Sequence, residues 1–122
     1  MTEQLTSTFT PCEIATRAAD AMNALNELTH GDGELTSSAD VRQIVASLEL
    51  IGQGLPQLCE QLARFLVTQH EDGRVAQLDG QDTGVLVTDV VEALAAAGQA
   101  ADMMTAALGE ARTATTGLSP AR

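Results

Sequence analysis

Apolar residues between positions 41 and 65 recur in alternating steps of three and four. The row consists of Val41, Ile44, Leu48, Ile51, Leu55, Leu58, Leu62 and Phe65. An α-helix brings residues at this spacing onto one side, so the heptad rhythm predicts a long amphipathic helix packed lengthwise against another helix, as in a coiled coil. Hydroxyl residues at 36–38 and an acid at Asp40 are typical of a helix start. We expect a helix over residues 38–71.

Pro56 lies inside this predicted helix, where it removes one backbone hydrogen bond and clashes with the preceding turn. Gly52 and Gly54 lie just before it. The three-and-four rhythm nevertheless crosses the proline without a slip. The pattern therefore favours a kinked but continuous helix, and two helices split near residues 53–55 are the alternative.

A second row at the same spacing follows Asp82 and Thr83, a further helix start. It consists of Val87, Val90, Leu94, Ala97, Ala101, Met104, Leu108, Ala111 and Thr115. The row predicts a helix over residues 83–116. Because this helix and the preceding one match in length, we expect an antiparallel hairpin in which the two rows face each other and Leu62 lies in the core.

A shorter helix is predicted near the N-terminus. Thr10 is a suitable N-cap, Pro11 suits the first helical position, and Glu13 completes a capping box. With a helix over residues 10–30, the fold class is all-α, a three-helix bundle per chain in a single domain of residues 1–122. Residues 1–9 and 117–122 are expected to be flexible, and the structure of the 72–82 loop stays open. Since the first helix is too short to cover both long ones, a homodimer is expected.

The charge pattern narrows the possible partners. The formal net charge is −11, with only 6 cationic residues. Nucleic acids and anionic membrane surfaces bind positive fields, so neither is expected as a direct partner, whereas a basic protein is compatible. No apolar run reaches the roughly 20 residues of a membrane span, and the first residues lack a secretory signal. We expect a cytoplasmic protein.

Candidate metal ligands are scattered along the chain. His30, His70, Cys12 and Cys59 lack helical ligand spacing, and the two histidines fall at opposite ends of the long helix. We therefore expect no metal and no cofactor. The register of the first two helices places Cys12 and Cys59 at a similar height, either as two core residues or as a redox-sensitive pair.

Acidic residues gather around the predicted turn between the long helices. The candidates for a basic partner are Glu71, Asp72, Asp79, Asp82, Asp89 and Glu92. Catalytic carboxylates need a pocket that shifts their pKa values, and a slim helical bundle offers little concavity. No nucleophile elbow or phosphate-binding loop is present. We expect a solvated acidic end or a docking patch, and not an enzyme.

Three stretches carry a resemblance to known proteins: residues 21–26 (AMNALN) with Thr29, Leu35-Thr36 before Asp40-Val41, and residues 55–58 (LPQL) followed by residues 60–62 (EQL). In these stretches the chain resembles small uncharacterised helical proteins of streptomycetes and related actinobacteria. Such proteins are often encoded near replication or transfer genes of mobile elements. The resemblance implies an accessory or regulatory role and identifies no functional residue.

These observations lead to three hypotheses about function. The first is a non-enzymatic acidic interaction protein that self-associates through its helices. The second is an acidic antagonist or regulator that binds a basic, DNA-binding protein. The third is a helical bundle that binds a small molecule in a cavity beside Pro56.

Overall fold

The computed structural model describes residues 8–31, 34–76 and 82–119. Over these residues it contains three α-helices and no strand: α2 (Pro11–Leu28), α3 (Ser38–Glu71) and α4 (Thr83–Thr115). The all-α prediction is confirmed, and the predicted bounds are met to within two residues. The chain forms two compact units, residues 1–37 and 38–122, and each is described by itself. Packing of the first helix along the hairpin, and the single domain it implies, stay predictions. The expected flexible ends lie mostly outside the described residues.

The helix of the first unit begins as its sequence predicts. The Thr10 side chain accepts a hydrogen bond from the backbone N–H of Glu13 at 3.1 Å, and the Glu13 carboxylate accepts one from the Thr10 N–H at 3.0 Å. This capping box satisfies two backbone donors that the helix itself leaves free. The hydrogen bonds also lower the pKa of Glu13 below its ordinary value.

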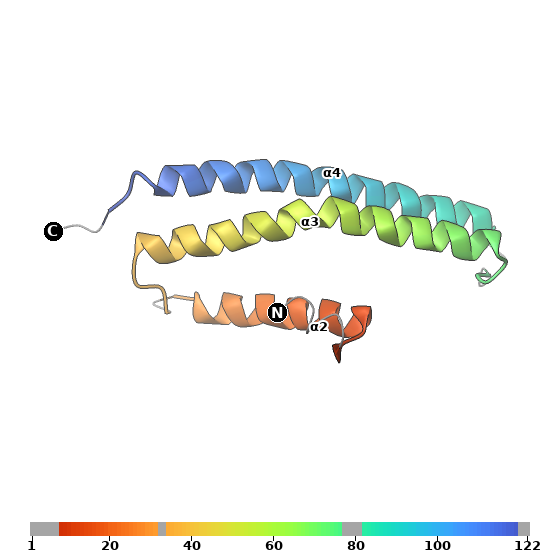
Figure 1. Ribbon diagram of the computed structural model, residues 1–122, viewed down its shortest axis with the longest axis horizontal. Coiled ribbons are helices and arrows are strands. Elements are labelled where there is room, and N and C mark those ends of the chain that lie inside the picture. The colour runs from red at the N-terminus through yellow and green to blue at the C-terminus, as the bar shows by residue number, and fades with distance from the viewer. Residues whose placement is uncertain (1–7, 32–33, 77–81, 120–122) are drawn as a thin grey trace. The chain divides into compact units, whose positions relative to one another are not determined.

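The second unit is an antiparallel hairpin in which α3 and α4 lie side by side along their lengths (Figure 1). Helix α3 ends in a left-handed glycine, Gly73, with φ of 71°. The N–H of Arg74 donates to the carbonyl of Gln69, and the N–H of Gly73 donates to that of His70, which together form a Schellman motif. Helix α4 begins at the N-cap Asp82, whose carboxylate accepts from the Val85 N–H at 3.1 Å.

Pro56 bends α3 without breaking it. The helix runs unbroken from Ser38 to Glu71, so the alternative of two helices split near 53–55 is wrong. In Figure 1 it changes direction near its middle. There Gly98 of α4 faces the proline, and a Cβ atom placed on Gly98 would lie 3.4 Å from the Pro56 Cα. This distance is an ordinary van der Waals contact, so the two helices lie side by side at the bend.

Small residues dominate the seam between the two helices. The residues that face α4 are buried or half-buried and follow the series Val45, Glu49, Gly52, Pro56, Cys59, Ala63 and Leu66. Their counterparts on α4 are Val91, Leu94, Gly98, Ala101, Thr105, Leu108, Arg112 and Thr115. Both series alternate in steps of three and four, as helices packed lengthwise require. The seam is therefore narrow, with glycine and alanine at its most buried positions.

The predicted core assignment on α3 was wrong for the exposed members of the row, whereas Ile44, Leu48 and Leu55 are half-buried. Its strongest apolar row, Val41 to Phe65, lies one residue before the seam and turns to its side. Leu62 of that row is 50% exposed and Phe65 is 65% exposed. On α4 the predicted row matches the seam in part, at Leu94, Ala101, Leu108 and Thr115. Val90 is 43% exposed, and Met104 is 40% exposed although its methyl group lies beside Gly52. Each helix carries two rows of residues with the same spacing, and on α3 the row with the smaller side chains packs against the partner helix.

The close approach at Gly52 is testable with a matched pair of glycines. A Cβ atom at Gly52 would overlap the Thr105 hydroxyl, whereas one at Gly54 would meet nothing within 4 Å. We expect Gly52→Ala to lower the free energy of unfolding by about 1–3 kcal/mol, because it forces the helices apart. We expect Gly54→Ala to raise it by about 0.5–1 kcal/mol through helix propensity. Chemical denaturation followed by circular dichroism measures both, and equal effects would contradict the proposed seam.

Candidate functional site

The apolar rows of α3 and α4 emerge on one side of the hairpin. Successive residues of a helix are turned by about 100°, so a residue that precedes a seam residue points sideways. Because the two helices run in opposite directions and face each other, the preceding residues of both helices point to the same side. On α3 they are the row from Val41 to Phe65. On α4 they are Leu86, Val90, Ala93, Ala97, Ala100, Met104, Ala107, Ala111 and Ala114. We call these two rows the apolar face.

The apolar face carries no charged residue and is widely exposed. Seven of its large side chains show exposed fractions from 40% at Val41 and Met104 to 65% at Phe65, with Ile51, Leu58, Leu62 and Val90 between. Ile44, Leu48, Leu55 and Leu86 are half-buried. The alanines of its α4 row are exposed as well. Monomeric soluble proteins rarely leave so long a contiguous apolar surface open, and such patches mark interaction sites.

The opposite side of the hairpin carries polar and charged residues among apolar ones. Residues that follow the seam residues include Gln53, Gln57 and Glu60 on α3, and Gln99 and Asp102 on α4, but also Leu50, which is 68% exposed. A surface groove of about 330 Å³ lies on this side beside Pro56, where Cys59, Gly98 and the carboxylates of Glu60 and Asp102 contribute to its walls. The two sides of the hairpin thus differ in charge: the apolar face has no charged residue, and the opposite side has several.

An ion pair joins the two helices within the seam. The Arg112 Nε donates to the Glu49 carboxylate at 2.6 Å, and the Glu49 side chain is only 15% exposed. The hydrogen bond from Arg112 lowers the pKa of Glu49, and the same bond raises the pKa of Arg112. Gly109 lies beside the pair, since a Cβ there would approach the Glu49 carboxylate to 3.1 Å. The pair fixes the register of the hairpin near its open end.

The predicted acidic docking residues separate into different roles. Glu71 and Asp72 are exposed at the end of α3, and Asp89 and Glu92 are exposed on α4. Asp82 is occupied as the N-cap of α4. Asp79 lies outside the described residues. Over the part of the hairpin end that is described, the acids therefore line separate helix surfaces, and no cavity gathers them.

The other residues considered for chemistry are not brought together. Cys59 lies in the seam beside Gly98, Cys12 is exposed on α2, and both thiols are free. Because these cysteines belong to different units, their mutual approach stays a prediction. Within the described ranges, no group of three or more His, Cys, Asp or Glu side chains is placed to hold a metal ion.

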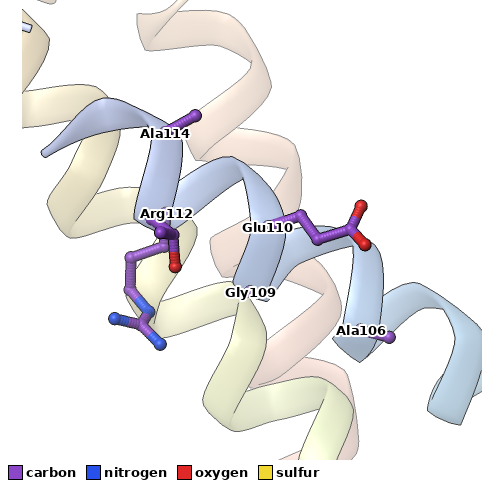
Figure 2. Close-up of a pocket in the computed structure, with 6 residues that line it drawn as sticks. Ala106, Gly109, Glu110, Arg112 and Ala114 are labelled. Atoms are coloured by element: carbon purple, nitrogen blue, oxygen red, sulfur yellow. The ribbon is translucent and has the colours of Figure 1, made fainter. Parts of the chain in front are cut away.

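A further hollow, of about 570 Å³, lies on α4 itself (Figure 2). Its lining residues all belong to one helix, between Ala106 and Ala114. Arg112 and Glu110 point to opposite sides of that helix, so they do not converge on a common point. Ligand pockets surround most of the ligand's surface, and a hollow between the side chains of a single helix does not.

Helix α4 has a property that the sequence analysis did not anticipate. By length and composition it is apolar enough to cross a membrane, and only 11% of its most apolar stretch is buried within the structure. Its alanines and glycines produce this composition, and the same small residues form the seam with α3. The apolar face itself was also missed, because the sequence analysis assigned the row from Val41 to Phe65 to the hairpin core.

The seam ion pair predicts a pH dependence of stability. The folded-state pKa of Glu49 lies below that of the unfolded chain, so its contribution is present above the ordinary glutamate pKa of about 4.3 and is lost as the pH falls through the folded value. We expect Glu49→Gln to lower the free energy of unfolding at pH 7, and the difference from wild type to shrink below pH 4. The control is Glu60→Gln, which removes an exposed pair with Arg64 inside α3 and should change little. Equal pH profiles for the two variants would contradict the role of Glu49.

Comparisons with known proteins identify no relative. No model of a known protein family matches the chain. No curated protein and no solved structure matches it either. Its function must therefore be inferred from its own surfaces.

Proposed function

We propose that this chain is a non-enzymatic, acidic helical interaction protein that self-associates through the apolar face of its α3–α4 hairpin. One observation carries the proposal: an uncharged apolar surface extends along both helices and is not covered by the hairpin itself. Apolar area removed from water stabilises an association by roughly 25 cal/mol per Å² before the costs of binding are subtracted.

The size of the face suits a stable interface. The face extends along helices of 34 and 33 residues, and each partner in a standard interface buries about 800 Å². Helix α2 has 18 residues and α3 has 34. At about 1.5 Å per residue, one helix of that length covers about half of such a face at most.

The charge distribution supports association through this face and not through the acids. The net charge of −11 makes two copies repel each other. The apolar face holds none of these charges, so two faces can meet with the acids directed to solvent. Salt screens the repulsion between copies and strengthens apolar burial. Self-association should therefore tighten as salt rises, whereas binding of a basic protein to the acidic surface would weaken.

We expect sedimentation equilibrium at tens of micromolar to show a dimer, and the variant Leu62→Glu to weaken dimerisation at least about 100-fold, because each copy would bury an unpaired charge. The control is Gln57→Glu on the polar side of α3, which adds the same charge away from the face. Circular dichroism of both variants should retain the wild-type helix content, since both positions are exposed in the hairpin. A wild-type chain that stays monomeric would overturn the proposal.

A further inference from the structure

The two rows of the apolar face differ in side-chain size. The α3 row holds Leu, Ile, Val and Phe, whereas the α4 row is mostly alanine between Ala93 and Ala114. Side chains of the face therefore project farther from the backbone over α3 than over α4. Packed interiors require large side chains to lie opposite small ones, because voids and overlaps both cost stability.

Two copies can bring such faces together around a two-fold axis in two ways. If the axis runs along the helices, α3 of one copy lies over α4 of its partner, and the two hairpin turns lie at the same end. If the axis runs across the helices, α3 lies over α3, α4 lies over α4, and the turns lie at opposite ends. Both arrangements are isologous, as closed dimers require.

Only the first arrangement matches large rows with small rows. In the second, bulky side chains such as Leu58 and Phe65 would meet the bulky row of the partner, and the alanines would face alanines across a gap. Every neighbouring pair of helices is antiparallel in both arrangements, so the helix dipoles do not distinguish between them and the match of side-chain sizes does. The geometry points to a second copy of this chain as the occupant of the apolar face, in a four-helix bundle whose two hairpin turns lie side by side. This inference rests on the proposed self-association and adds its orientation.

Distances between copies test the orientation. Spin labels are attached at Asp72→Cys, in the turn after α3, within a full-length Cys12→Ser/Cys59→Ala chain. Neighbouring helices lie 8–10 Å apart, so the labels should be about 20–30 Å apart in the proposed dimer. In the crossed arrangement the length of α3 separates them by about 50 Å. A label at Gly54→Cys, near the middle of α3 and in open space, gives similar distances in both arrangements and serves as the control.

The outcomes separate the two claims. A single short distance between turn labels supports the inference. A distance of about 50 Å, or a mixture of long and short distances, overturns the orientation and leaves self-association standing. If sedimentation shows a monomer under the labelling conditions, the proposed function and the inference both fail. If the monomeric chain floats with neutral phosphatidylcholine vesicles, the apolar face binds lipid. That outcome would overturn both the proposed self-association and the inferred orientation.

A substitution in the alanine row of α4 gives a second test, because the two arrangements predict opposite changes in dimer affinity. Gly98 faces Pro56 and Cys59, so the adjacent Ala97 lies at the height of Leu58 on the apolar face. In the proposed dimer, Ala97→Leu inserts bulk where the partner's large row already packs, and should weaken dimerisation about tenfold. In the crossed dimer it would fill the gap between alanine rows and tighten dimerisation. The double variant Ala97→Leu/Leu58→Ala should recover affinity relative to Ala97→Leu alone, and a failure to recover would contradict the pairing of these rows.

Discussion

The hairpin depends on how closely α3 and α4 approach each other. At Gly52 the Thr105 hydroxyl occupies the space where a Cβ atom would be, and at Gly98 a Cβ atom would just touch the backbone of Pro56. The contact at Gly52 leaves no room there for a large side chain between the helices. Leu58, Leu62 and Phe65 of α3 lie beside the seam and are exposed. The apolar face thus accompanies a seam built from small residues.

The proline and the glycines act together in this arrangement. Pro56 removes a backbone hydrogen bond and bends α3, which in an isolated helix only destabilises. Here the bend accompanies the approach to Gly98, and the heptad rhythm continues beyond it. Toward the open end of the hairpin, the ion pair between Glu49 and Arg112 crosses the same seam. Along the hairpin, a glycine–hydroxyl contact, a glycine–proline contact and one ion pair thus join the two helices at defined heights.

The sequence predicted the elements well and one interface wrongly. Capping residues such as Thr10 and Asp82 act within a few residues of themselves, so they fix where helices begin without knowledge of the rest of the fold. Periodicity likewise predicted the lengths of α3 and α4 and the continuity across Pro56. Periodicity does not say which of two parallel rows meets the partner helix, because rows one residue apart share the same rhythm. The row of Gly52, Cys59 and Ala63 is less hydrophobic than the row of Leu58, Leu62 and Phe65, and only the steric contacts of the hairpin distinguish them.

A seam of small residues also limits how much a lone hairpin can stabilise itself. Burial of apolar area is the main favourable term in folding, and Ala101 is the buried apolar side chain of the described core. Most of the remaining large apolar side chains of α3 lie on the exposed face. A hairpin with this distribution gains more from covering the face than from the contacts it already has, so folding and association are linked by mass action. The acidic residues behind the net charge of −11 lie away from that face, so in the proposed dimer they stay in solvent. In the proposed dimer, the side chains that a single hairpin leaves exposed become the interface.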